Sequence, residues 1–186
     1  MTDRMPKTIE RLQLEHRNMT RLLHLLSDEM ESYRAGGRPD FDLLGSVMEY
    51  ILHYPDLFHH PTENMIFQKM LGRDPAAQSR VGDLLKEHAQ LADLTRRLAA
   101  ALRNVSSDVE VPRSWLQGIV ENYLSSSYQH MSDEESTFFP LAVATLREED
   151  WDEIDAALTV KEDPLFGGKL VEEYRALHDR IMRSVV

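Results

Sequence analysis

The chain has 186 residues, a formal net charge of −11, a hydrophobic fraction of 42% and no cysteine. This length fits a single domain with a substantial core, and the absence of cysteine excludes disulfides, iron–sulfur clusters and cysteine-type zinc sites. The acidity argues against a nucleic-acid surface or docking on anionic lipid. No apolar run approaches the roughly 20 residues that span a bilayer, and no signal peptide is evident. We therefore expect a cytoplasmic protein without membrane contact.

Helical spacing of apolar residues predicts a first helix over residues 7–34, which ends before a pair of glycines. Asp40 can cap a second helix over residues 41–71. Pro55 and Pro61 lie inside this second helix and should bend it or divide it into two segments, because each lacks a backbone N–H. We expect one bent rod.

The segment 72–75, with its Gly-Arg-Asp-Pro sequence, predicts a boundary between two helices. A third helix, capped by Asp74 and with Pro75 in its first turn, should run to about Arg103, followed by a polar loop over residues 104–112. A fourth helix is expected from about residue 112 to 147, with a kink at Pro140.

The remaining residues predict a short helix over 150–159, a loop over 161–169 and a last helix over 170–184. No strand-like alternation is present, so the predicted fold class is all-α. Because the connections are short, we expect an up-down-up-down four-helix bundle over residues 1–147, with a helical C-terminal extension over residues 148–186 packed on the bundle.

Two histidines are each followed four residues later by a glutamate. His59 precedes Glu63, and His130 precedes Glu134. Residues four apart on a helix differ by about 40° and share one face. Such pairs also arise by chance and often mark only a solvated helix face, but aromatic and aliphatic residues surround both pairs here. The pattern therefore favours two His–Glu pairs that face the core.

The depth of each residue along its helix brings these pairs together with two further histidines. We measured heights from the start of the first helix at ~1.5 Å per residue in an antiparallel bundle. The six side chains then fall in one slab. The heights are ~15 Å for His16, ~18 Å for His59, ~12 Å for Glu63, ~20 Å for His88, ~24 Å for His130 and ~18 Å for Glu134.

These six residues are the candidate metal ligands. Imidazole binds iron, zinc and copper, and carboxylates can bridge two ions. The set suits iron first, and manganese or zinc second. His60 lies three residues before Glu63 and can replace or join His59. His53 lies seven residues before His60 and is a further candidate, as a ligand or as a partner that orients one, if Pro55 does not disturb the helical phase.

At this point the residues resemble the hemerythrin-like, HHE cation-binding family, over roughly residues 8–147. The closing segment 163–167 also resembles the tail of one bacterial subgroup. The segments that carry the resemblance are Glu15-His16, residues 53–63 with their His-His-Pro-Thr-Glu ending, Glu87-His88, residues 130–135, and Phe138-Phe139-Pro140.

The resemblance implies a non-haem centre of two iron ions with an oxygen bridge in a four-helix bundle. It implies that Glu63 and Glu134 bridge the two ions. Family roles include reversible O₂ binding, sensing of O₂, NO or iron, and repair of damaged iron centres. The oxygen carriers of the family place two histidines four apart on the third helix, whereas Leu84 and Ala92 flank His88 here. The ligand set is nearer to the repair and sensing branches.

Three functions remain open from the sequence. The first is a binding or sensing module, not an enzyme, whose partner is a diatomic ligand such as O₂ or NO, or iron itself. The second is a di-iron enzyme, such as an oxidase, a peroxide-decomposing enzyme or an iron-centre repair protein. The third is a metal-free structural or partner-binding bundle. Trp151, Leu165 and Phe166 in the extension favour packing, onto the bundle or in a homodimer.

Overall fold

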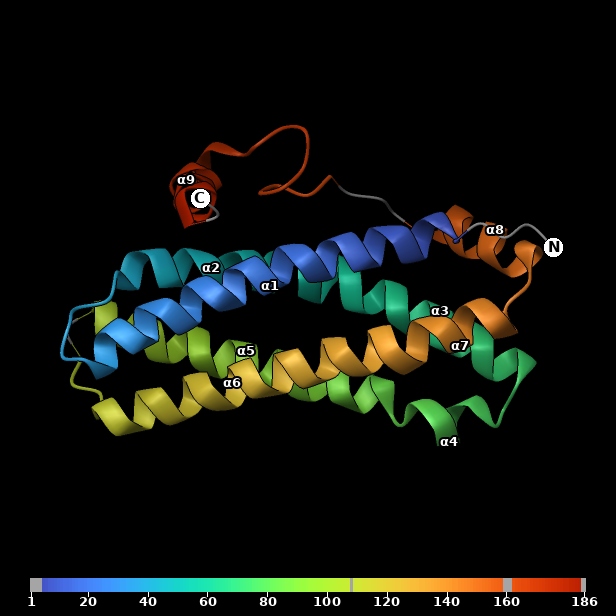
Figure 1. Ribbon diagram of the computed structural model, residues 1–186, viewed down its shortest axis with the longest axis horizontal. Coiled ribbons are helices and arrows are strands. Elements are labelled where there is room, and N and C mark those ends of the chain that lie inside the picture. Colours follow the sequence, from blue (N-terminus) through green and yellow to red (C-terminus); the bar gives the residue numbers. More distant parts are fainter. Residues whose placement is uncertain (1–4, 108, 159–161, 185–186) are drawn as a thin grey trace.

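The computed structural model describes residues 5–107, 109–158 and 162–184. No strand occurs among these residues, which confirms the predicted all-α class. Four rods lie side by side and alternate in direction, as Figure 1 shows. The first rod is a single helix, α1 (Lys7–Arg34), and its bounds match the predicted ones.

The second rod is divided, whereas the sequence predicted one bent helix. It consists of α2 (Phe41–His53), a π-helical turn η1 (Pro55–His59) and α3 (His60–Arg73). The side chain of Asp40 caps α2 by accepting the N–H of Leu43, as expected. Pro55 and Pro61 cause the division, because neither ring nitrogen can donate to the helical ladder.

The third rod also differs from the single helix that was expected. A short helix α4 (Ala77–Val81) ends at Gly82, whose φ of 88° interrupts the helix before α5 (Leu84–Ser106) begins. Asp83 caps α5 by accepting the N–H of Lys86. The cap of the long helix was predicted at Asp74, because the following proline made that position the stronger start signal.

The fourth rod consists of α6 (Arg113–Asp133), a second π-helical turn η2 (Glu134–Phe138) and α7 (Phe139–Thr145). The kink predicted at Pro140 takes the form of this turn. Figure 1 places α6 and α7 along one line beside α1 and α5.

The extension begins with α8 (Glu148–Ala157), which packs on α3. Arg73 donates two hydrogen bonds of 2.9 Å to Asp150 across this contact. A 3₁₀ turn η3 (Glu172–Tyr174) and α9 (Arg175–Ser184) follow, and α9 packs on α1 and α2 (Figure 1). Among the described residues, no helix combines the length and apolar composition that crossing a bilayer requires.

Two apolar clusters fill the bundle, one on each side of a polar layer. In α1, Leu12 belongs to one cluster and Leu22 to the other, and buried His16 lies between them. In the second rod, Tyr54 and Ile66 belong to opposite clusters. The core is therefore interrupted at the depth where the sequence placed its candidate ligands.

Candidate metal centre

A π-helical turn adjoins each of the two His–Glu pairs. The turn η1 ends on His59, and η2 begins on Glu134. A proline lies two residues beyond the first turn and two beyond the second, and in each case the backbone bond that closes the turn spans five residues, from His60 to Pro55 and from Phe139 to Glu134. Single π turns inside α-helices are rare and are often found at functional sites.

All six candidate ligands lie in the interior, and they meet at one depth. None is more than 6% exposed. One comes from α1, two from the second rod, one from α5 and two from the fourth rod. In chain order they are His16, His59, Glu63, His88, His130 and Glu134.

The carboxylate of Glu63 faces histidines on both sides of the cluster. Its Oε1 lies 3.1 Å from Nε2 of His59 and 3.7 Å from Nε2 of His16. Its Oε2 lies 3.4 Å from Nε2 of His88. The two oxygens of one carboxylate are thus directed at two different groups of imidazoles.

Glu134 repeats this arrangement from the opposite rod. Its Oε2 lies 3.3 Å from Nε2 of His16. Its Oε1 lies 3.3 Å from Nε2 of His88 and 3.1 Å from Nε2 of His130. Two carboxylates therefore lie between a pair formed by His16 and His59 and a pair formed by His88 and His130.

Each of these four imidazoles has a polar partner on its outer nitrogen, Nδ1. A partner on Nδ1 fixes the tautomer and leaves Nε2 directed inward with its lone pair, which is the arrangement of metal-bound histidine. Every partner comes from a different rod than its histidine and is the chain neighbour of a candidate ligand. The contacts are Glu15 to His59 at 2.7 Å, Asn64 to His88 at 2.8 Å, Glu87 to His130 at 3.4 Å and Glu135 to His16 at 3.1 Å.

Many inward-facing atoms of the cluster have no aligned hydrogen-bond partner within the described chain. They are Nε2 of His16, His59 and His130, both oxygens of Glu63, and Oε2 of Glu134. Some of these atoms lie close together, but they are not oriented as donor and acceptor. Buried polar atoms without a partner destabilise a fold. Cations held between the two histidine pairs would satisfy these atoms, so the donor set fits metal ions.

The electrostatics show how the cluster compensates its charge with protons. Burial lowers the pKa of both His16 and His59, but neighbouring carboxylates outweigh it. Glu134 and Glu63 raise the pKa of His16 to about 9, and Glu63 and Glu15 raise that of His59 to about 10. Burial raises the pKa of Glu63, yet neighbouring imidazoles bring it down to about 2. The carboxylates therefore stay ionised and attract positive charge, which protons or metal ions can supply.

The other two histidines differ from each other. The pKa of His88 is lowered, chiefly by burial, so this imidazole is neutral and ready to bind a cation at physiological pH. Burial also opposes charge on His130, but contacts with Glu134 raise its pKa. The pKa of Glu134 lies well below its ordinary value, because the surrounding histidines overcome its burial.

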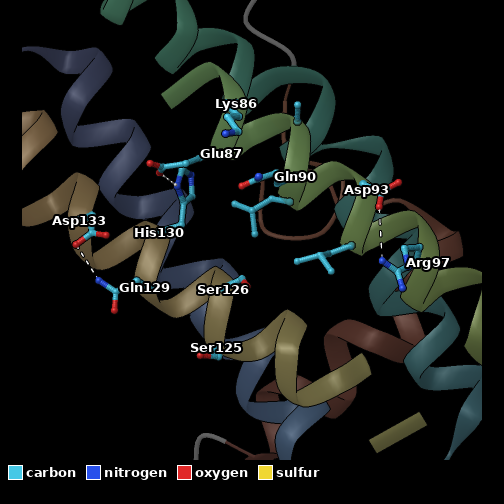
Figure 2. A pocket seen from close by; sticks show the side chains of 13 residues that line it. Lys86, Glu87, Gln90, Asp93, Arg97, Ser125, Ser126, Gln129, His130 and Asp133 are labelled. Atoms are coloured by element: carbon cyan, nitrogen blue, oxygen red, sulfur yellow. Dashed lines mark hydrogen bonds and ion pairs between the residues drawn. The ribbon is translucent and has the colours of Figure 1, made fainter. Parts of the chain in front are cut away.

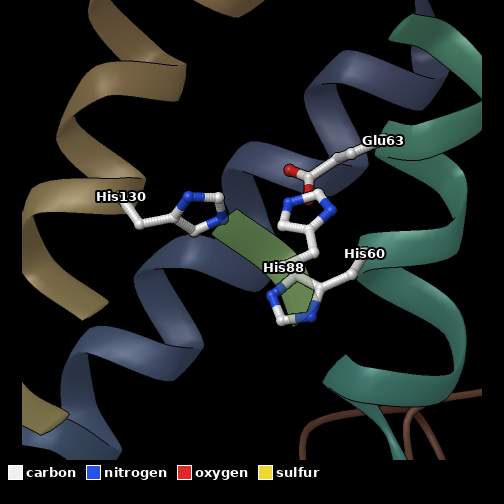
Figure 3. A group of neighbouring side chains, drawn as sticks. All are labelled: His60, Glu63, His88 and His130. Atoms are coloured by element: carbon white, nitrogen blue, oxygen red, sulfur yellow. The ribbon is translucent and has the colours of Figure 1, made fainter. Parts of the chain in front are cut away.

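The two additional candidates from the sequence lie in different places. The side chain of His53 is 62% exposed and contacts its own helix at Glu49, away from the cluster. His60 lies against the cluster, with a nitrogen within 4.8 Å of ligand atoms of Glu63, His88 and His130 (Figure 3). Tyr54 and the π turn change the helical phase between them, so the shared face predicted from a continuous helix does not exist.

The ring orientation of His60 favours a supporting position. Its ring stacks on that of His88, with centroids 4.4 Å apart and planes inclined by 20°. The plane of an imidazole ligand contains its metal ion, so two rings stacked almost parallel do not both point at one ion. The Nδ1 of His60 lies 3.3 Å from Asp56, which holds the ring against His88.

A small cavity of about 30 Å³ adjoins the cluster. A single water needs roughly 10–15 Å³ of such volume, so the cavity has room for one diatomic molecule. Apolar side chains such as Leu23 and Ile51 form much of its wall, and His59, His130 and Tyr123 also line it.

A larger groove of about 840 Å³ opens to solvent between α5 and α6 (Figure 2). His130 and Leu91 line both this groove and the small cavity, so they separate solvent from the cluster. Glu87 lies at the groove side of His130 and is 42% exposed. The cluster is buried, but only one layer of side chains covers it here.

Comparison with known proteins agrees with this geometry. A family model described as the hemerythrin HHE cation binding domain matches residues 7–142. No curated protein and no solved structure matches the chain. The match includes every side chain of the cluster and ends before the C-terminal extension.

Proposed function

The chain belongs to the family of hemerythrin HHE cation-binding domains, and from this premise we infer that it holds two iron ions and binds or senses a small ligand such as O₂ or NO. Metal binding as such follows from the family and from the His/Glu cluster. The choice of iron, the number of ions and the small ligand are our proposal. Manganese or zinc is the second choice of metal.

One observation carries the proposal: each of two buried carboxylates directs its two oxygens at opposite histidine pairs. In the proposed site His16 and His59 hold one ion, and His88 and His130 hold the other. Glu63 and Glu134 would contribute carboxylate oxygens to both ions. Iron in such a site supplies reversible changes of oxidation state and open coordination positions for a small molecule.

The residues around the ions have separate tasks in this proposal. The outer carboxylates and the amide of Asn64 hold the Nδ1 protons, so that every Nε2 keeps its inward direction. The apolar wall of the 30 Å³ cavity limits the size of the bound molecule and excludes bulk water. Tyr123 keeps its proton, since burial raises its pKa, and can donate a hydrogen bond there.

The first experiment is elemental analysis of the purified protein by a method that identifies the element. We expect close to two iron ions per chain. Protein with no stoichiometric metal would support a metal-free bundle instead.

The second experiment is anaerobic loading with ferrous iron, followed by O₂ or NO. A new visible absorption band is expected, and a spectrum that neither gas changes would exclude the small-ligand proposal.

The alternative function is a di-iron enzyme, and the open groove favours it. Its volume of about 840 Å³ lies in the range of pockets that hold substrates larger than a diatomic molecule. Peroxide turnover by the iron-loaded protein tests one version of this alternative. Activity that disappears in Glu63→Ala would support it, and equal turnover in the variant would exclude it.

A further inference from the structure

The C-terminal extension lies beyond the residues that the family model matches, yet part of it is buried against the bundle. Leu165, Leu177 and Ile181 are at most 2% exposed and belong to the larger apolar cluster. In Figure 1, α9 lies on the side of the bundle formed by α1 and α2. The described segment 162–184 is thus part of the folded unit.

A carboxylate in this segment makes a specific contact with α2. Asp163 Oδ1 accepts the backbone N–H groups of Leu165 and Phe166, both at 2.9 Å. Its Oδ2 accepts the hydroxyl of Tyr50 at 2.9 Å. Gly167 belongs to the same turn, and a Cβ there would collide with the Asp163 carbonyl oxygen. The turn is therefore shaped to direct one carboxylate oxygen at Tyr50.

Tyr50 and its neighbours continue this contact inward. Its ring stacks on that of Tyr54, with centroids 5.8 Å apart and planes inclined by 22°. The hydroxyl of Tyr54 donates to Oε1 of Glu15 at 3.3 Å. The other oxygen of Glu15, Oε2, accepts from Nδ1 of His59 at 2.7 Å. Side-chain contacts thus lead from the extension to a candidate metal ligand.

Both tyrosines are buried and held in place, so a shift of Asp163 would also shift Glu15. Tyr50 is 1% exposed and Tyr54 5% exposed, and burial holds the pKa of both hydroxyls above the ordinary value. Each hydroxyl therefore remains a donor, and a carboxylate accepts from it: Asp163 from Tyr50 and Glu15 from Tyr54. Phe166 and Tyr174 pack edge-on against the Tyr50 ring, so the extension fixes the ring as well as its hydroxyl.

We propose that Asp163 is a positioning residue of the metal centre, which acts on His59 through Tyr50, Tyr54 and Glu15. The inference rests on the proposed metal site. Docking of segment 162–184 and metal binding at His59 then stabilise each other. Such coupling is reciprocal: metal binding should strengthen docking of the extension, and loss of docking should weaken metal binding to the same degree. The extension thereby gives the bundle a contact through which its docking changes metal affinity.

The test uses two single variants of the full chain, Asp163→Asn and Tyr50→Phe. The second variant keeps the aromatic ring and removes only the hydroxyl. Glu162→Gln is the matched control, since it removes a charge from the same turn but contacts Lys169 and not Tyr50. Metal affinity is measured by competition with a chromophoric chelator, using Zn²⁺ as the probe. Amide hydrogen exchange over residues 164–181 is measured with and without Zn²⁺.

In the unaltered chain, Zn²⁺ should slow amide exchange over residues 164–181. Asp163→Asn and Tyr50→Phe should each weaken Zn²⁺ affinity about five- to tenfold and abolish this response. Glu162→Gln should change neither quantity. A merely structural contact would lower the melting temperature of the metal-free and metal-loaded variants equally and leave the affinity unchanged.

Three results would overturn the inference, and they differ in what else they reject. Uptake of Zn²⁺ by the unaltered chain without any change in exchange of the extension rejects the coupling and leaves the metal site intact. Equal affinity in all variants has the same meaning. Failure of the unaltered chain to take up metal rejects both the coupling and the proposed function.

Discussion

The four candidate ligand histidines and their outer partners form a closed ring around the bundle axis. Each rod supplies a partner to the histidine of the next, and the fourth supplies one to the first. Adjacent residues on a helix differ by about 100°. When His16 points to the bundle axis, its neighbour Glu15 therefore points to the adjacent rod, where it contacts His59. Likewise Glu87, beside His88, contacts His130.

The sequence predicted the inner ring of candidate ligands but not the outer ring of their partners. His16 and the other five inner candidates follow from spacing and depth, which helical geometry determines. Glu15 and Glu87 were noticed only as neighbours of histidines. Their partners lie on other rods, so identifying them required the rotation of each helix about its axis. The one signal in the sequence for such a partner was a polar residue of suitable length next to a candidate ligand.

Removal of His88 should separate a ligand from a supporting histidine. We predict that His88→Ala lowers metal content from about two ions per chain to one or fewer, because α5 offers no substitute. His60→Ala is the matched variant, and it should retain most of the metal, since its ring stacks on His88. Elemental analysis of both proteins measures this. Equal losses in the two variants would show that His60 is also a ligand.

The raised pKa values of His16 and His59 predict competition between metal and protons. With values of about 9 and about 10, both imidazoles carry protons at pH 7.5 in the metal-free chain. Metal binding requires them neutral. Loading with Zn²⁺ in weak buffer should therefore release roughly two protons per chain. A pH indicator detects the released protons. The control is the same protein solution to which buffer without metal is added.

The same competition sets the direction of the pH dependence. Metal affinity should fall as the pH is lowered, and metal content that stays constant down to pH 4 would contradict histidine ligation.

The stability of the metal-free fold depends on the pH in the opposite direction through these two histidines. Because folding raises both pKa values above 6.5, the protonated imidazoles stabilise the fold fully below that pH, and this contribution is lost as the pH rises through about 9 to 10.

At the scale of elements, glycines mark where rods are divided and where they are not. Gly82 has a φ of 88°, a conformation that an L side chain adopts only with strain, whereas Gly118 lies inside α6 with open space around it. We predict opposite effects. Gly82→Ala should destabilise the fold by about 1 kcal/mol, and Gly118→Ala should stabilise it by about as much.

Thermal unfolding of the two variants measures the difference. For a domain of this size, about 1 kcal/mol corresponds to a shift of roughly 2–4 °C in melting temperature. The metal content of both variants should equal that of the unaltered chain. A lower melting temperature for Gly118→Ala would mean that the replacement disturbs packing at α6.

Element boundaries were predictable where the local signal was unambiguous. The bounds of α1 follow from its apolar spacing and the glycines after it. Gly82 was not identified as a helix end, because Asp74 and the following proline gave a stronger start signal only a few residues earlier. The π turns were not predicted either. A proline shows that a donor is missing, but the replacement bond depends on how the cluster holds His59 and Glu134.

At the scale of the whole molecule, the polar layer divides the apolar core into two clusters. Such a layer lowers the stability of the metal-free fold, since its unpaired atoms are buried. The extension compensates in part by adding apolar side chains to the larger cluster. The expectation of a homodimer stays a prediction. Leu165 is already buried within its own chain, so it does not supply a dimer surface.

This division predicts that metal determines much of the stability of the whole fold. A ligand that binds only the folded state stabilises it by about 2.7 kcal/mol at one hundred times its dissociation constant. Removing bound metal with a chelator should therefore lower the melting temperature by roughly 5–10 °C. Glu63→Gln removes the charge of a proposed metal-binding carboxylate, so the melting temperature of this variant should respond little to the chelator. If the chelator instead shifts both proteins equally, the stabilising ion lies elsewhere, and the buried cluster is not the metal site.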